Sequence, residues 1–148
     1  MKNNNGFSLV ELIVVIAIMA ILVGVLAPSV LGQIDKANVA KDKQACDAVL
    51  TAFATAYADQ DVTTGKPSAS GAITSVITFA DSGSQAAVTT SGSTFTDAVR
   101  TILGYSNVVW ASNTFKGSSQ SITFNPVTGK FTLTVTSSAG STIYTISK

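Results

Sequence analysis

An unbroken apolar run near the amino end constrains this chain more than any other feature of its sequence. Every position over residues 12–27 is apolar or glycine, in the order LIVVIAIMAILVGVLA. Mainly apolar character continues on both sides, over residues 7–9 and at Val30 and Leu31. A helix that spans a bilayer needs about 20 predominantly apolar residues. The run reaches that length if a few polar residues and Pro28 are tolerated within it, which predicts a membrane-spanning helix.

Three interpretations of this amino end are open. A cleaved secretory signal would end at a small-x-small site after the apolar core, but Pro28 directly follows the candidate site, which is unfavourable for cleavage. A plain single-pass anchor accounts for the run but leaves Glu11 unexplained. A carboxylate near the centre of a helix in lipid costs about 2.5–3.5 kcal/mol, so an acidic residue there is by default a functional group with a partner. The third interpretation accounts for all of these residues together.

The sequence MKNNNGFSLVE, followed by the apolar run, closely resembles the class III signal of type IV pilins and pseudopilins. The resemblance is specific over residues 1–31 and only general beyond them. It implies that a prepilin peptidase cuts after Gly6, that the new amino-terminal Phe7 is N-methylated, and that Glu11 guides assembly. It also implies further partners: the cytoplasmic membrane before assembly, the pilus assembly platform and its ATPase, and other copies of the chain in a helical homopolymer.

The apolar pattern becomes one-sided after the run. Cys46, Val49 and Phe53 recur at the i, i+3 and i+7 spacing of one helix face, so a helical stretch over residues 33–58 is predicted. Together with the run it forms one long helix over residues 7–58. Cys46 is expected to be buried on the inner face of that helix as a small apolar residue. Lys43 and Asp47, four residues apart on a more polar face, are expected to support the helix weakly.

Gly24 and Pro28 predict a weak point within the long helix. Pro28 has no N–H to donate to the carbonyl of Gly24, and its ring crowds that carbonyl. Glycine adds a helix cost of about 1 kcal/mol. A mild kink is common in membrane helices and is one outcome. The resemblance implies another, in which the helix unwinds here when the subunit enters a filament.

Residues 61–148 are predicted to form a globular domain, which we call the head. Loops are expected over residues 65–71 and 81–93, while residues 72–80 fit either a strand or a helix. Thr94 has cap spacing before a short helix over residues 95–103 that Gly104 stops. Strand patterns cover residues 108–111, 121–124, 131–136 and 142–147, with turn residues at 125–129 and 137–141. These strands predict an antiparallel meander laid across the amphipathic helix, an α+β fold of the type IV pilin kind.

Composition argues against several other functions. Charged residues make up 11% of the chain and the net charge is +1, so no basic stripe is present to bind nucleic acid. The chain has no histidine, and Cys46 is its single cysteine, which rules out a disulfide within one chain. Trp110 and Tyr105 are expected to be core or edge aromatics. Four aspartates lack EF-hand spacing: Asp59, Asp61, Asp81 and Asp97. We expect no catalytic site, no cofactor and no metal site.

The sequence therefore predicts a structural subunit with four segments. Residues 1–6 form a leader, residues 7–31 the membrane and filament-core half of the helix, residues 32–60 the amphipathic half, and residues 61–148 the head. Before assembly the subunit is expected in the cytoplasmic membrane as a single-pass protein, and afterwards in a surface filament for adhesion, motility or DNA uptake. A pseudopilin or competence pilin of a secretion or transformation machine is the alternative within the family. A membrane-tethered binding domain is the alternative from another class.

Overall fold

The computed structural model describes residues 7–73, 76–83 and 94–148, and its longest element is the helix α1, Leu9–Ala58. The predicted helix over residues 7–58 is confirmed to within two residues at its amino end. Pro28 lies inside α1, and the helix continues through Gly24 and Pro28 without a break. The predicted unwinding concerns the assembled filament and stays a prediction. Two compact units divide the chain, with residues 1–36 in the first and Ala37–Lys148 in the second.

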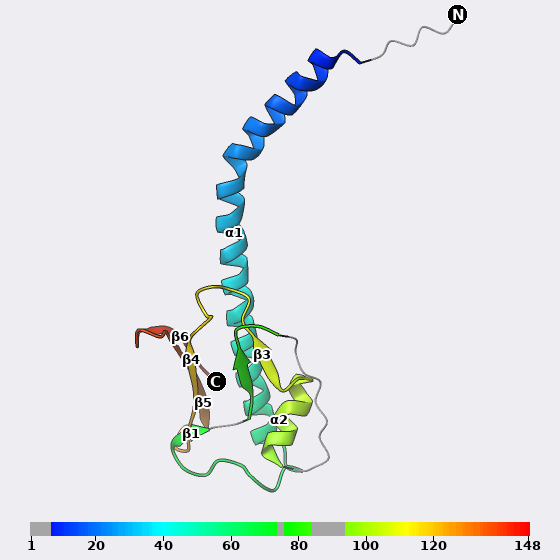
Figure 1. Ribbon diagram of the computed structural model, residues 1–148. Coiled ribbons are helices and arrows are strands. Elements are labelled where there is room, and N and C mark those ends of the chain that lie inside the picture. The colour runs from blue at the N-terminus through cyan, green and yellow to red at the C-terminus, as the bar shows by residue number, and fades with distance from the viewer. Residues whose placement is uncertain (1–6, 74–75, 84–93) are drawn as a thin grey trace, which may run out of the picture. The chain divides into compact units, whose positions relative to one another are not determined.

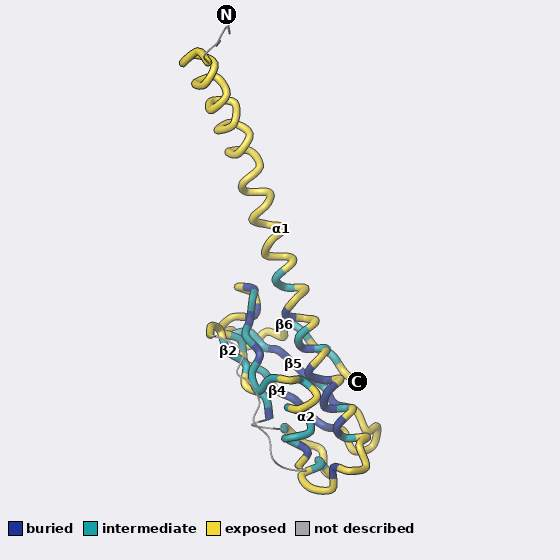
Figure 2. The backbone as a smooth tube through the Cα atoms, turned by 90° about the vertical axis from the view of Figure 1, so that its right-hand side faces the viewer, coloured by how far each residue is buried: buried dark blue, intermediate teal, exposed yellow. Residues whose placement is uncertain are grey.

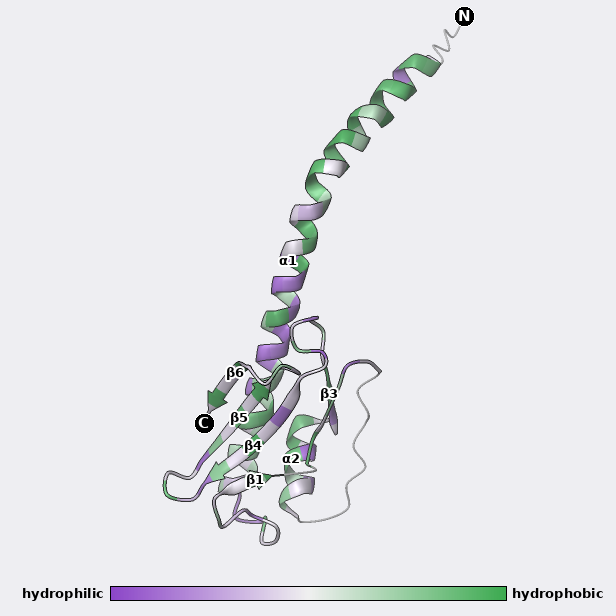
Figure 3. Cartoon of the chain, turned by 60° about the vertical axis from the view of Figure 1, so that its left-hand side comes forward, coloured by the Kyte–Doolittle hydropathy of each residue, from purple (hydrophilic) through white to green (hydrophobic). Residues whose placement is uncertain are grey.

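The apolar side chains in the described part of the first unit are exposed. The large hydrophobic residues from Leu9 to Ile34 are exposed, as the unbroken yellow of this part of α1 shows in Figure 2. Figure 3 shows the same stretch as mostly hydrophobic. Among the described residues, α1 is the helix whose length and apolar composition would let it cross a membrane. The prediction of a spanning helix is consistent with this exposed surface.

The core of the second unit is built on the inner face of α1. Cys46, Val49 and Phe53 are fully buried, as their spacing predicted. Phe53 contacts the rest of the core through its ring, whose centroid lies 5.7 Å from that of Phe95 and 5.6 Å from that of Phe131. The amphipathic half of the helix therefore packs under the head, which fits the α+β, pilin-like fold class (Figure 1).

The larger sheet has four antiparallel strands in the order β1-β4-β5-β6. Their bounds are Gly71–Ile73, Ser119–Asn125, Lys130–Thr136 and Thr142–Ser147. Along β5 the buried residues Phe131, Leu133 and Val135 alternate with half-buried threonines. Consecutive strands β4, β5 and β6 pair in sequence order, so the predicted antiparallel meander is confirmed for these three strands. The turn after β4 also forms as predicted, because the Asn125 side-chain oxygen accepts the Val127 N–H at 3.0 Å.

A second, two-stranded sheet departs from the predicted meander. Strand β2, Thr78–Ala80, pairs in parallel with β3, Asn107–Val109. The strand expected over residues 108–111 is therefore present but belongs to this separate sheet. Residues 72–80, left open between strand and helix, contain the end of β1 and the whole of β2, with residues 74–75 outside the described part. Parallel strands need a long crossover, which usually contains a helix, and α2 lies between these two in sequence.

The short helix α2, Phe95–Leu103, begins and ends where the sequence predicts. The Thr94 side chain accepts a hydrogen bond from the backbone N–H of Asp97 at 3.3 Å, which caps the amino end. Gly104 closes the other end with φ of 75°, a left-handed conformation that glycine adopts without a Cβ clash. Of the loop predicted over residues 81–93, residues 81–83 form exposed bends. The remainder lies outside the described residues.

Candidate functional site

The first turn of α1 places the Glu11 side chain. Phe7 and Ser8 are not helical, so Ser8 occupies the cap position and Glu11 the third position of the helix. The Ser8 backbone N–H donates to Glu11 Oε2 at 2.9 Å. The Leu12 N–H bonds to the Ser8 carbonyl at 3.3 Å. Glu11 therefore satisfies a backbone donor that the helix itself cannot use, as in a capping box.

The sequence interpretation missed this cap, although its signal is visible. Ser8 and Glu11 have the S-x-x-E spacing that was recognised at Thr94. The apolar neighbours of Glu11 favoured an interpretation as an assembly residue instead. The contact gives Glu11 one partner within its own chain, alongside the assembly role that the resemblance implies. Gly6, the other half of the predicted cleavage site, lies outside the described residues.

The surface around Glu11 is apolar and exposed. Phe7 is 86% exposed, Leu9 73% and Leu12 59%. Exposed apolar surface of this extent, continuing along α1, marks a contact with lipid or with protein. A carboxylate inside such a contact loses its water and needs a positively charged or hydrogen-bonding partner. The geometry thus presents one negative charge at the amino end of the apolar first part of α1.

A second carboxylate, Asp42, is buried in the head unit, and the sequence interpretation did not single it out. Its side chain is 1% exposed. Asp42 Oδ1 accepts the Ala111 N–H at 2.8 Å, and Oδ2 accepts both the N–H and the hydroxyl of Ser112, at 2.8 and 2.5 Å. Asp42 stands four residues before Cys46, which places it on the same inner face of α1. The four-residue spacing between Asp42 and Cys46 is the sequence feature that indicates burial of Asp42.

Cys46 is buried and free, as expected. Burial raises the pKa of its thiol from the ordinary value of 9.0 to about 12, and the nearby charge of Asp42 adds to the shift. Both effects disfavour the thiolate, which is the reactive form of cysteine. Cys46 is therefore an inert core residue in the folded chain.

We expect Cys46 in the folded chain to resist thiol labelling at neutral pH and to react quickly once urea unfolds the protein. The folded pKa is raised, so the thiol's contribution to stability is complete below pH 9.0 and declines as the pH rises toward about 12. Labelling with a maleimide, followed by intact mass, measures the reaction. Complete labelling of the folded chain within the time that the unfolded chain requires would contradict the burial.

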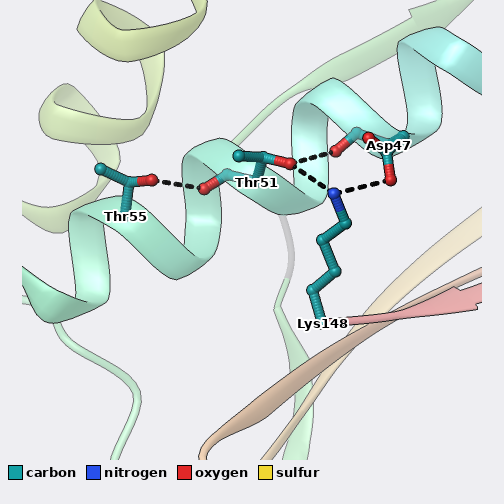
Figure 4. Close-up of polar contacts among 4 residues, drawn as sticks. All are labelled: Asp47, Thr51, Thr55 and Lys148. Atoms are coloured by element: carbon teal, nitrogen blue, oxygen red, sulfur yellow. Dashed lines mark hydrogen bonds and ion pairs between the residues drawn. The ribbon is translucent and has the colours of Figure 1, made fainter.

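Lys148 makes a polar contact on the outside of α1. Lys148 Nζ lies 2.7 Å from Asp47 Oδ1 and 2.8 Å from Thr51 Oγ1, as Figure 4 shows. The expected pairing of Asp47 with Lys43 is therefore wrong. Lys43 Nζ instead lies 5.4 Å from the centre of the Tyr144 ring. The end of β6 brings a competing cation to Asp47, which helix spacing alone does not reveal. Exposed pairs of this kind contribute about 0–1 kcal/mol.

Other candidate residues form no site among the described residues. Trp110 is buried and stacks on Phe79 with ring centroids 5.1 Å apart, whereas Tyr105 is half-buried, so both are core or edge aromatics. Asp81 Oδ1 accepts the Gly117 N–H at 2.9 Å. Asp59 Oδ1 accepts the Asp61 N–H at 3.0 Å. In the described ranges, no three His, Cys, Asp or Glu side chains are placed to hold a metal ion.

Comparison with known proteins identifies the amino end alone. Residues 1–27 match the family model of the prokaryotic N-terminal methylation motif. No curated protein and no solved structure matches the chain. The match covers the predicted leader, the Glu11 position and the start of the exposed apolar helix. The match confirms the class III prepilin signal that the sequence predicts at the amino end.

Proposed function

We propose that this chain is a pilin that polymerises into a type IV pilus on the cell surface. One observation carries the proposal: the methylation motif at residues 1–27 leads directly into an apolar helix whose side chains are exposed. Such a surface needs lipid around it in the precursor and other subunits around it in the product. The same helix serves both states, first as a membrane anchor and then as the filament core.

Assembly proceeds through contacts between different surfaces of neighbouring copies. Contacts of this head-to-tail kind are open-ended and generate a helical filament. Transfer from lipid to a helix bundle gains little apolar burial, because lipid tails are as apolar as leucine. Close packing and polar pairing must therefore supply more of the selection. We propose residues 7–31 as the packing segment, with Gly24 and Pro28 as the place where the helix unwinds in the filament.

Glu11 is the polar group suited to this selection. After cleavage at Gly6, the amine of Phe7 lies close to Glu11 in sequence and can carry a positive charge. A buried carboxylate and a buried ammonium are each costly alone but offset one another as a pair. The partner is the amine of a neighbour already in the filament, since such a pair fixes the axial stagger of otherwise uniform helices. The contact with the Ser8 N–H holds the carboxylate at the helix end until then.

The mature chain is expected to begin at Phe7 and to carry an N-methyl group. Gly6 directly precedes Phe7 at the start of the apolar segment, and the methylation-motif match over residues 1–27 supports a cut after Gly6. Intact mass and amino-terminal sequencing of native material test this directly, and a start at Met1 or near Pro28 contradicts it. Replacing Gly6 with leucine should leave the precursor uncut in the membrane, because the bulky side chain blocks the peptidase.

A pseudopilin or competence pilin is the second candidate, because the matched motif is common to pilins and pseudopilins. Purifying surface filaments, imaging them and identifying their subunit by mass separates the two. Long filaments built mainly of this chain support the pilus. Filaments that lack it, with loss of secretion or transformation on its deletion, support the alternative. If the chain is instead a membrane-tethered binding domain, its deletion should leave both filaments and secretion unchanged.

A further inference from the structure

The buried carboxylate of Asp42 has no part in the assembly proposed above. Asp42 and Ser112 are the two polar side chains that are buried in the described part of the chain. All three hydrogen bonds to Asp42 come from Ala111 and Ser112, in the connection between β3 and β4. We call residues 111–118 the connecting loop. One residue of α1 thus holds the start of this loop through both of its carboxylate oxygens.

The connecting loop joins several parts of the head at this point. The Ser112 hydroxyl, which donates to Asp42, also accepts the Phe115 N–H at 3.3 Å. Phe115 is fully buried, and its ring centroid lies 5.1 Å from that of Trp110 and 6.3 Å from that of Tyr144 on β6. The loop leads from the two-stranded sheet into the four-stranded sheet. Its position on α1 therefore bears on how both sheets dock.

The remaining buried residues on this face of α1 are apolar: Cys46, Val49, Leu50, Ala52, Phe53 and Ala56. Apolar burial is non-directional, so it favours contact without selecting one turn of the helix over the next. Hydrogen bonds have narrow limits of distance and angle. The three hydrogen bonds to the Asp42 carboxylate form together at only one position of the connecting loop along α1. Fixing a register is the best-attested use of a buried polar group.

We infer that Asp42 is a register-determining residue, which fixes where the head docks along and around the amphipathic half of α1. Loss of Asp42 leaves the apolar face able to hold the head but removes the preference for one docked position. In the proposed filament, a single register gives every subunit the same outer surface. That consequence depends on the proposed function, whereas the register itself is a property of the single chain.

Nuclear magnetic resonance on the full-length chain in detergent tests the inference. Asp42→Leu replaces the carboxylate with an apolar group of similar size. In this variant the amides of the connecting loop should give more than one set of signals. Hydrogen exchange at Ala111 and Ser112 should accelerate at least tenfold, while exchange across β4 and β5 stays within about twofold of the unaltered chain. Asp47→Asn is the matched control, because it removes a half-buried acid of α1 whose partner is Lys148 and not the connecting loop, so it should leave the loop unchanged.

Two results with Asp42→Leu would overturn the inference. One is a single set of loop signals with unaltered exchange. The other is faster exchange throughout β4 and β5, which indicates a general contribution to stability. If Asp42→Leu does not fold, Ser112→Ala decides, since it removes the hydroxyl bonds and keeps both backbone donors to Asp42. It should accelerate loop exchange at least threefold without changing β4 and β5, and unaltered exchange rejects the role. These measurements use unassembled subunits, so their outcome does not depend on whether the chain forms the proposed filament.

Discussion

Replacing Glu11 with alanine is expected to give a subunit that is cut after Gly6, stays in the membrane and builds few or no filaments. In the proposed function, cleavage depends on the segment before the helix, and the apolar run anchors the chain without Glu11. The variant lacks the charge pair that is proposed to set the stagger between neighbours. Electron microscopy of surface filaments, with immunoblots of the processed subunit in the membrane, measures both effects. Normal numbers of filaments of normal length would show that Glu11 is merely a tolerated charge.

The structure gives Glu11 a second role that the alanine variant also removes, so a further variant is needed. Glu11→Gln can still accept the Ser8 N–H, because glutamine serves at the third position of a capping box. It carries no charge and cannot form an ion pair with the Phe7 amine. If pairing is the function, Glu11→Gln fails to assemble, as Glu11→Ala does. Filaments from Glu11→Gln but not from Glu11→Ala would assign the defect to the lost cap. Asp35→Asn, an exposed acid-to-amide change on the same helix, should assemble normally.

The features that sequence predicted well are those set by neighbours close in the chain. The span of α1 follows from an apolar run joined to a one-sided pattern, and the ends of α2 follow from Thr94 and Gly104. The alternation along β5 fixes which side chains face the core. Turn residues between β4, β5 and β6 leave short connections, so antiparallel pairing of neighbours follows. Each of these is decided within a few residues.

The features that sequence did not predict depend on residues far apart in the chain. Strand β1 pairs with β4 across about fifty residues, Gly71 opposite Phe124, and three residues carry too little pattern to reveal that partner. The same holds for the parallel pairing of β2 and β3. Asp42 has the spacing of the inner face, but the groups that donate hydrogen bonds to its carboxylate lie in the connecting loop. Burial of its charge is possible because the loop's backbone donors meet it, and helix periodicity contains no information about them.

Replacing Phe131 with alanine is expected to lower the free energy of unfolding of the head by about 3–5 kcal/mol. Phe131 is fully buried, and its ring centroid lies 4.9 Å from that of Phe124, 5.6 Å from those of Phe53 and Tyr57, and 6.1 Å from that of Phe95. The side chain thus joins α1, α2 and two strands at one point. Domains of ordinary stability have about 5–15 kcal/mol in total, so a loss of this size leaves the head marginal.

Val127→Ala provides the matched control, because Val127 lies in the turn between β4 and β5, four residues from Phe131, and is 92% exposed. Its truncation removes no core contact, so the free energy of unfolding should change by less than about 0.5 kcal/mol. Urea unfolding of the full-length chain in detergent measures both variants through the fluorescence of Trp110, the chain's single tryptophan, which is buried in the head. The apolar half of α1 stays in the micelle during this titration, so the transition reports the head. Equal midpoints for Phe131→Ala and the unaltered chain would mean that the aromatic cluster around Phe131 does not hold α1 to the sheet.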